Sequence, residues 1–300
     1  MRRPFAIALS IALSIALAAP LLPLPAIAAD LVKVVATLPI LKEFADQVGR
    51  ERVEVRTLIT GLESEHSYSP KPSDLKALGE ARLLLEVGLG LEVWVKGLVK
   101  NAGNPHLRVI TTSEGVGLIR DYTAETISSP SGNPHIWLDP ENAKVMVRHI
   151  ADGLIAVDPT HKTDYLNNLA DYLRRLDQVQ KDLQARVASL RDRRIVTYHP
   201  AWPYFARRFG FKIEGNIIQQ TGTEPSATHL AEMAHWIKAH KIKVIVSEPQ
   251  LNQKVARALA DETGARLVVL SPLPGTIKGT ETYLALLEYN VQQLVAALQS

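Results

Sequence analysis

Three histidines occupy similar positions in the sequence and could together hold a metal ion. His66, His135 and His199 each lie in a loop segment that follows a short stretch of apolar residues typical of a β-strand. In open α/β sheets, ligands gather beyond the carboxyl ends of the strands, where such side chains can meet. Neutral imidazole is a good ligand for zinc and for other first-row divalent ions. Three separate, hydrogen-bonded loop histidines are the alternative interpretation, and spacing alone leaves both open.

Proline lies beside two of these histidines. Pro134 precedes His135, and Pro200 follows His199. Proline fixes its own φ angle and pushes the preceding residue toward extended geometry, so it holds the backbone of a ligand in place before an ion arrives. The other six histidines lack such a setting. We expect surface or packing roles for them: His106, His149, His161, His229, His235 and His240.

Strands and helices are expected to alternate along the chain after residue 30. Such alternation is typical of a mainly parallel sheet with helices on its faces. The strands are expected at residues 31–38, 53–59, 82–87, 107–111, 194–198, 211–215, 243–246 and 266–270. The helices are expected at residues 39–48, 72–81, 91–101, from 139 onward, 158–191, from 202 onward, 225–240, 252–264 and 280–298.

One of these segments predicts an unusually long helix. Leucine or valine recurs every three or four residues from Leu166 to Leu190, and neither Gly nor Pro occurs between His161 and Tyr198. At 1.5 Å per residue such a helix is roughly 45 Å long, more than the width of one small domain. We therefore expect an α/β fold of two lobes, each a mainly parallel sheet flanked by helices, joined by one long rigid helix.

The N-terminus has the order of a secretory signal peptide. The basic pair Arg2-Arg3 is followed by an apolar run and by the small residues Ala26-Ile27-Ala28, which are typical of a cleavage site. Prolines interrupt the apolar segment and disfavour an uncleaved spanning helix. The expected parts are a signal peptide at 1–28, an N-terminal metal-binding lobe at 29–157, the linking helix at 158–191 and a C-terminal metal-binding lobe at 192–300.

Composition narrows the class of protein further. The chain has no cysteine, which excludes disulfides, thiolate metal sites and a lipid anchor on cysteine. It carries 34 basic and 31 acidic residues, a balance that gives no indication of a nucleic-acid partner. Together with the signal peptide, these features predict a protein of the periplasm.

Several motifs resemble one known family along nearly the whole chain after the signal peptide. The sequence is similar to the metal-binding periplasmic components of ABC importers for zinc and manganese, the cluster A-I group, and most of all to the zinc-uptake binding proteins. The residues that carry the resemblance are His66-Ser67-Tyr68, Pro72-Ser73-Asp74, Gly88-Leu89-Gly90-Leu91-Glu92, Asn133-Pro134-His135-Ile136-Trp137-Leu138-Asp139, Tyr198-His199-Pro200-Ala201-Trp202, Tyr204-Phe205-Ala206, Glu224-Pro225-Ser226 and Ser247-Glu248-Pro249-Gln250.

The resemblance implies both a function and a ligand set. It implies a two-lobed fold with a rigid linking helix, and it places the family's metal histidines at His66, His135 and His199. It also implies a periplasmic zinc-binding component that captures Zn²⁺ between two lobes and delivers it to an ABC permease and its ATPase at the inner membrane. We expect a monomer without a nucleic-acid partner. Participation of a metallochaperone is left open.

The type of residue at the third position bears on the choice of metal. In the family, manganese and iron binders tend to carry a carboxylate there, whereas zinc binders tend to carry histidine, and this chain has His199. Mn²⁺ is a harder ion that prefers oxygen donors, while a nitrogen-rich tetrahedral site suits Zn²⁺. Zn²⁺ is therefore the expected transported ligand, and a manganese-binding importer component is the alternative.

The fourth ligand departs from the family pattern. Many members have an aspartate in a Leu-Asp-Pro-Leu stretch, but here the corresponding stretch is Leu270-Ser271-Pro272-Leu273. A neutral serine is a poor zinc ligand, and three neutral histidines would leave the charge of the ion unbalanced. Glu65 can supply a carboxylate only if the loop turns at that point, since adjacent residues of an extended chain face opposite sides. Water is the other candidate.

Two further expectations concern what the chain does not contain. Residues 113–132 include no histidine, whereas some zinc-specific relatives carry a long His-rich insertion here, so we expect one tight site without an auxiliary metal-collecting segment. Three histidines with an open fourth position also describe a catalytic zinc site. No His-Glu-x-x-His motif occurs, so we expect no enzyme, and a zinc-dependent hydrolase is the weaker alternative.

Overall fold

Two parallel four-stranded sheets form the framework of the protein in a computed structural model that describes residues 31–120, 132–218 and 224–299. The expected signal peptide at 1–28 lies outside the described residues. The strand orders are β2-β1-β3-β4 in the first sheet and β6-β5-β7-β8 in the second. The strands are β1 (Val32–Ala36), β2 (Val53–Thr57), β3 (Leu83–Glu86), β4 (Arg108–Thr111), β5 (Arg194–Thr197), β6 (Lys212–Asn216), β7 (Val244–Ser247) and β8 (Arg266–Val269).

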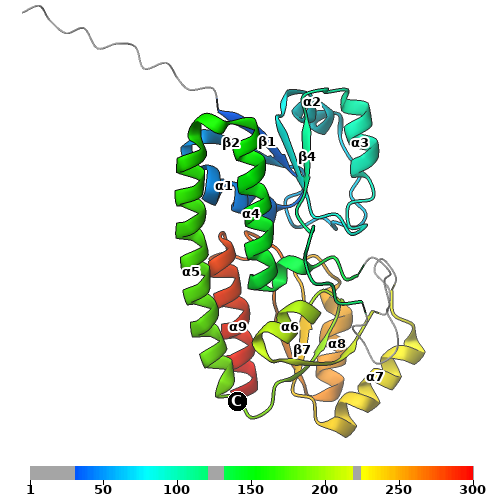
Figure 1. Cartoon of the computed structure of the whole chain (residues 1–300). Helices are drawn as coiled ribbons and strands as arrows, with labels where there is room; N and C mark the ends of the chain where they lie inside the picture. Colours follow the sequence, from blue (N-terminus) through cyan, green and yellow to red (C-terminus); the bar gives the residue numbers. More distant parts are fainter. Residues whose placement is uncertain (1–30, 121–131, 219–223, 300) are drawn as a thin grey trace, which may run out of the picture. The chain divides into compact units, whose positions relative to one another are not determined.

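The expected α/β fold is confirmed, because helices alternate with these strands (Figure 1). The helices are α1 (Pro39–Gly49), α2 (Pro72–Glu80), α3 (Val95–Ala102), α4 (Pro140–Val157), α5 (Lys162–Ala188), α6 (Pro203–Phe209), α7 (Ala227–His240), α8 (Gln253–Thr263) and α9 (Tyr283–Gln299). Three short 3-10 turns are η1 (Arg50–Arg52), η2 (Ile136–Leu138) and η3 (Pro159–His161). None of the described helices has both the length and the apolar character needed to cross a membrane.

The two sheets share one arrangement, and it positions the candidate residues. In each sheet the chain starts in an inner strand and then moves to both sides of it, which creates a switch point beside β1 in the first sheet and beside β5 in the second. All strand pairs are parallel, so the loops after the strands leave each sheet at the same edge. His66 follows β2, His135 follows β4 and His199 follows β5, so all three lie at carboxyl ends of strands.

The helix that contains Val95 starts later than the sequence predicts. We expected it from Leu91, but α3 begins at Val95. Gly88, Leu89 and Gly90 all have positive φ angles, of 85°, 59° and 77°, and form a turn. The buried carboxylate of Glu92 accepts hydrogen bonds from the backbone N–H groups of Val87 (2.8 Å) and Gly88 (3.0 Å). These contacts hold the segment in a non-helical form that local periodicity does not reveal.

Helix α5 runs along both halves of the protein, as expected for the long helix. Its 27 residues extend for about 40 Å, and it packs against α1 and α4 of the first half and against α9 and α6 of the second (Figure 1). It is preceded by η3, where Asp158 accepts hydrogen bonds from Tyr165 Oη (2.6 Å) and lies 2.7 Å from His161 Nδ1. Tyr172 and Leu176 are fully buried near its middle.

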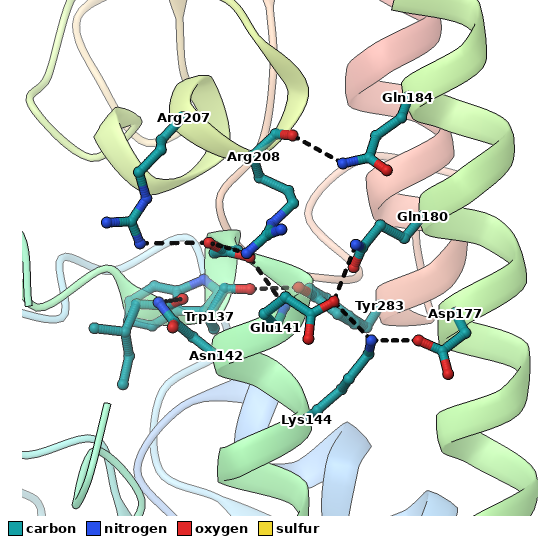
Figure 2. Close-up of polar contacts among 12 residues, drawn as sticks. Trp137, Glu141, Asn142, Lys144, Asp177, Gln180, Gln184, Arg207, Arg208 and Tyr283 are labelled. Carbon is teal, nitrogen blue, oxygen red and sulfur yellow. Dashed lines mark hydrogen bonds and ion pairs between the residues drawn. The ribbon is translucent and has the colours of Figure 1, made fainter. Parts of the chain in front are cut away.

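A polar network connects α4, α5 and α6 (Figure 2). Asp139 is fully buried and caps α4 by accepting a hydrogen bond from the backbone N–H of Glu141 (2.9 Å). Arg208 of α6 pairs with both carboxylate oxygens of Asp139, at 2.6 and 3.0 Å. Lys144 of α4 pairs with Glu141 and with Asp177 of α5. Charged groups from three helices therefore hold the two halves together beside the loop that carries His135.

Candidate metal centre

The structure brings together the three histidines that the sequence singled out. One ring nitrogen from each of His66, His135 and His199 lies within 4.8 Å of the others. The ring centroids are 4.9 Å apart for His135 and His199 and 5.7 Å apart for His66 and His199. Two imidazoles come from loops of the first sheet and one from the second. A single cation can reach all three nitrogens without a large movement of the backbone.

Glu65 also faces this cluster. Its Oε1 atom lies 3.4 Å from His135 Nε2 and 3.9 Å from His66 Nε2, and its side chain is buried. The loop turns at this point, because the backbone N–H of Ser67 donates to the carbonyl of Ser64 (3.3 Å). That turn lets the adjacent side chains of Glu65 and His66 point into the same space, which an extended segment would forbid.

Ser271 has a different role, within its own loop. Its hydroxyl donates to the carbonyl of Leu273 (2.7 Å) and accepts from the backbone N–H of Leu273 (3.1 Å), and it also contacts the hydroxyl of Thr276. Ser271 is fully buried and is not part of the histidine cluster. The serine at this position therefore stabilises a turn after β8.

The electrostatics of the cluster favour neutral imidazoles on the side of the first lobe. Burial lowers the pKa of His66 to about 3, and the neighbouring His135 adds to the effect, while Glu65 opposes it. Burial also holds the pKa of His135 well below its ordinary value, and His199 contributes in the same direction. Neutral imidazole is the form that binds a metal, so these two rings are ready to bind at neutral pH.

Three buried polar atoms of the cluster have no hydrogen-bond partner among the described residues. They are Glu65 Oε1, His66 Nε2 and His135 Nε2. Leaving such atoms buried and unpaired costs about 1–3 kcal/mol each. A divalent cation would satisfy all three at once, and the donor set of nitrogens with one carboxylate oxygen is the set that Zn²⁺ prefers. The residues present therefore fit a metal ion.

Glu248 is a member of the site that the sequence interpretation left without a role. Its Oε1 accepts a hydrogen bond from Trp202 Nε1 (2.9 Å) and lies 3.5 Å from His199 Nδ1. Burial acts to lower the pKa of His199, but the Glu248 carboxylate outweighs it and leaves this pKa raised. A carboxylate beside a metal-binding imidazole fixes the orientation of the ring. The only signal in the sequence was the Ser247-Glu248-Pro249-Gln250 motif.

The other histidines lie apart from this cluster, in line with the surface and packing roles expected for them. His149 Nδ1 lies 3.1 Å from the carbonyl of Thr112, and His240 stacks on Trp236. His229 Nε2 lies 3.3 Å from the carbonyl of Asn216. Among the described residues, the one group of three or more His, Asp or Glu side chains with the spacing of a metal site is His66, His135 and His199.

The fold and the cluster together define a class of protein. Two parallel sheets direct their loops toward one cluster of imidazoles, and a long helix connects the halves, as in binding proteins that hold a small solute between two lobes. A family model described as "Zinc-uptake complex component A periplasmic" matches residues 34–297. The chain therefore belongs to this zinc-uptake component family.

Individual relatives agree with this assignment. The high-affinity zinc uptake system protein ZnuA of Bacillus subtilis is 28% identical over 281 residues, which cover 90% of this chain and 88% of the relative. A zinc-bound crystal structure of a ZnuA deletion mutant superposes with a TM-score of 0.80 at 29% identity, covering 90% of this chain and 98% of that one. A Mn-bound periplasmic metal-binding protein from Candidatus Liberibacter asiaticus gives a TM-score of 0.77 at 27% identity, covering 88% and 98%.

Proposed function

We propose that this protein is the zinc-binding component of an ABC importer and that it holds Zn²⁺ with His66, His135 and His199. The observation that carries the proposal is the convergence of three imidazole nitrogens within 4.8 Å in a family of zinc-uptake components. Glu65 is proposed as the fourth ligand, because its Oε1 is buried, unpaired among the described residues and directed at two of the rings. Its negative charge offsets half of the charge of the ion in a poorly solvated site.

The exposure of the three rings suggests the order of capture. The side chain of His66 is 24% exposed, compared with 3% for His135 and 5% for His199. An incoming ion therefore meets His66 first and then reaches the two buried rings. Because the imidazoles of His66 and His135 are neutral at neutral pH, binding at these two rings does not have to displace protons.

Manganese is the second candidate ligand, since one similar structure contains Mn²⁺. The donor set argues for zinc, because three nitrogens and one oxygen suit Zn²⁺, while Mn²⁺ prefers oxygen-rich sites. Competition between the two ions for metal-free protein separates the candidates. We expect one Zn²⁺ per chain and a clear preference for Zn²⁺. A preference for Mn²⁺, or two or more tightly bound zinc ions per chain, would contradict the proposal.

Substitution of the histidines tests the ligand assignment. His135→Ala and His199→Ala should each lower zinc affinity by several orders of magnitude in competition with a chelator, because each removes one of few donors. His240→Ala is the matched control, since His240 is exposed and stacks on Trp236 outside the cluster. Unchanged affinity in either cluster variant would exclude that residue as a ligand.

The remaining parts of the proposal concern delivery and organisation. The protein is proposed to act as a monomer in the periplasm after cleavage of a signal peptide at 1–28, and to deliver its ion to a membrane permease driven by an ATPase. The proposed lobes at 29–157 and 192–300 each contain one of the sheets, and the helix at 158–191 joins them. The metal is cargo in this proposal, so the protein is not an enzyme.

A further inference from the structure

Asn133 connects two of the candidate ligands through its side chain. It is buried, with 1% of its surface exposed, two residues before His135. Its Oδ1 accepts a hydrogen bond from the backbone N–H of His135 (3.0 Å) and lies 2.9 Å from His135 Nδ1. Its Nδ2 donates to the carbonyl of Pro200 (2.7 Å), the residue that follows His199 in the other sheet's loop. One amide therefore contacts both loops of the site.

These partners fix the orientation of the amide. A backbone N–H can only donate and a carbonyl oxygen can only accept, so the atom facing the His135 N–H must be Oδ1 and the atom facing Pro200 must be Nδ2. Oδ1 cannot donate, and it lies within hydrogen-bond distance of His135 Nδ1. Nδ1 of a neutral His135 must therefore carry the ring proton.

The position of the proton determines which nitrogen can bind a metal. With a proton on Nδ1, the lone pair of a neutral His135 is on Nε2. Nε2 is the atom that lies 3.4 Å from Glu65 Oε1 and has no hydrogen-bond partner among the described residues. Burial holds the pKa of this imidazole well below its ordinary value, so the ring stays neutral at neutral pH.

The backbone of Asn133 is also held from both sides. Its N–H donates to the carbonyl of Ile119 (2.8 Å), and its carbonyl accepts a hydrogen bond from Tyr204 Oη (3.0 Å) in α6. The amide is thus anchored to the second half of the protein by Tyr204 and by Pro200. A shift of one histidine loop is transmitted to the other through a single buried side chain.

We infer that Asn133 is a positioning residue for metal capture, which fixes the Nδ1–H tautomer of His135 and ties its ring to the loop that carries His199. This role rests on the proposed metal site. The inference requires that His135 adopt this tautomer in the metal-free protein. It also requires that loss of the amide weaken zinc binding without removal of a ligand.

The tautomer can be read directly in metal-free protein labelled with ¹⁵N-histidine, using long-range ¹H–¹⁵N correlation spectra at pH 8. The His135 signals are assigned by their absence in His135→Gln. We expect wild-type His135 with the proton on Nδ1, and a shift toward the Nε2–H form in Asn133→Ala. A wild-type His135 with its proton on Nε2, or an unchanged tautomer in Asn133→Ala, would overturn the inference.

Asn142→Ala is the matched control. Asn142 is also a buried asparagine, and its amide donates to the carbonyl of Ile136 (3.2 Å) in the same loop. It contacts no histidine of the cluster, so this variant should lose some stability but keep both the tautomer and the zinc affinity. Asn133→Ala should bind zinc about 10- to 100-fold more weakly, the range for residues that support metal ligands. Equal affinities of Asn133→Ala and wild type would contradict the inference.

Asn133→Asp provides a second test in case the alanine variant does not fold. Aspartate keeps an acceptor for His135 Nδ1–H but loses the donor to Pro200, so we expect the wild-type tautomer together with weakened zinc binding. An Nε2–H tautomer in this variant, or wild-type affinity, would count against the inference. Titration of wild-type protein with Zn²⁺ separates the two levels, because a wild type that fails to bind zinc refutes the proposed function itself.

Discussion

At the scale of single residues, the site depends on where one carboxylate is placed. The position at which many relatives carry an aspartate is Ser271 here, and its hydroxyl is used within a turn. Glu65 brings a carboxylate to the cluster from the opposite half of the protein, beside His66. The charge that offsets the cation thus comes from a neighbour of the first ligand. This exchange of donor keeps the chemistry of the site and changes which loop must be ordered when the ion binds.

Glu65→Gln tests this role because it keeps the size of the side chain and removes its charge. We expect zinc affinity to fall by about 10- to 100-fold, less than for loss of a histidine, since water can replace the lost oxygen. Affinity is measured by competition with a chelator. Glu63→Gln is the control, because Glu63 is in the same loop but binds the backbone N–H of Thr60 (2.8 Å). Wild-type affinity in Glu65→Gln would show that this carboxylate is not a ligand.

At the scale of elements, helix ends and loops hold the site in place. The loop that carries His135 runs through η2 into α4, and Asp139 caps that helix while it pairs with Arg208 of α6. Trp137 Nε1 donates to the carbonyl of Pro272 (2.7 Å), so the same loop also contacts the segment after β8. The His135 loop is therefore fixed to the second half at several points along five residues.

Arg208→Ala should destabilise the protein strongly. It leaves the fully buried carboxylate of Asp139 with Arg207 at 3.5 Å as its nearest remaining cation. Removing one partner of a buried ion pair costs about 3 kcal/mol or more. Arg174→Ala is the control, because Arg174 forms an exposed pair with Asp171 (2.9 Å) and such pairs contribute about 0–1 kcal/mol. Chemical denaturation measures both values, and similar small losses would show that the Asp139–Arg208 pair is not structural.

At the scale of the whole molecule, the two halves are joined by more than one helix. Helix α5 packs on elements of both halves, and Asn133, Trp137 and Asp139 all contact the second half. A hinge movement would have to break these buried contacts together. Metal binding is therefore expected to order the site locally instead of closing one half on the other.

Small-angle scattering checks this expectation. The radius of gyration of metal-free and zinc-loaded protein should be the same within error, because the buried contacts between the halves do not involve the metal. Hydrogen exchange should slow mainly in residues 61–70 and 133–138 when zinc binds, since these loops carry Glu65, His66 and His135. Protein stripped with chelator and reloaded with zinc serves as the control for damage. A clear decrease in the radius of gyration on loading would exclude this form of capture.

Glu43 makes the stability of the fold depend on pH. It lies on α1, is buried, and accepts a hydrogen bond from Tyr172 Oη of α5 (3.1 Å). Burial raises its pKa from 4.5 to about 7, against the opposing effect of the Tyr172 hydroxyl. Because the folded form holds the proton more tightly than the unfolded chain, its contribution is fully present below pH 4.5 and is lost as pH rises to about 7.

Glu43→Gln should remove this dependence, because the amide imitates the protonated carboxyl at every pH. Relative to wild type, the variant should gain on the order of 3 kcal/mol in the free energy of unfolding between pH 4.5 and pH 8. Denaturation curves at both pH values measure the change. Glu288→Gln, an exposed substitution on α9, should show a difference from wild type that does not vary in this way. A constant difference for Glu43→Gln would mean that Glu43 is ionised in the folded protein at neutral pH.

The sequence by itself determined the alternation of strands and helices, the long helix and the positions of the three histidines. These features are local, because strand alternation, helix periodicity and starts such as Asp139-Pro140 depend on residues within a few positions of one another. The direct contact of His66, His135 and His199 followed from a general property of parallel sheets, whose carboxyl ends share one edge. The resemblance to zinc-uptake proteins gave the same three residues.

Only the tertiary structure decided which other side chains serve the site. Glu65 faces the cluster because of a turn closed between Ser64 and Ser67, and Glu248 meets His199 across 49 residues of chain. Asn133 bonds to Pro200 across 67 residues. Local preferences fix how the backbone runs, but they do not fix which loops meet. That is set by the packing of the two sheets against the helices between them, and the direction of each polar side chain follows from the partners it finds there.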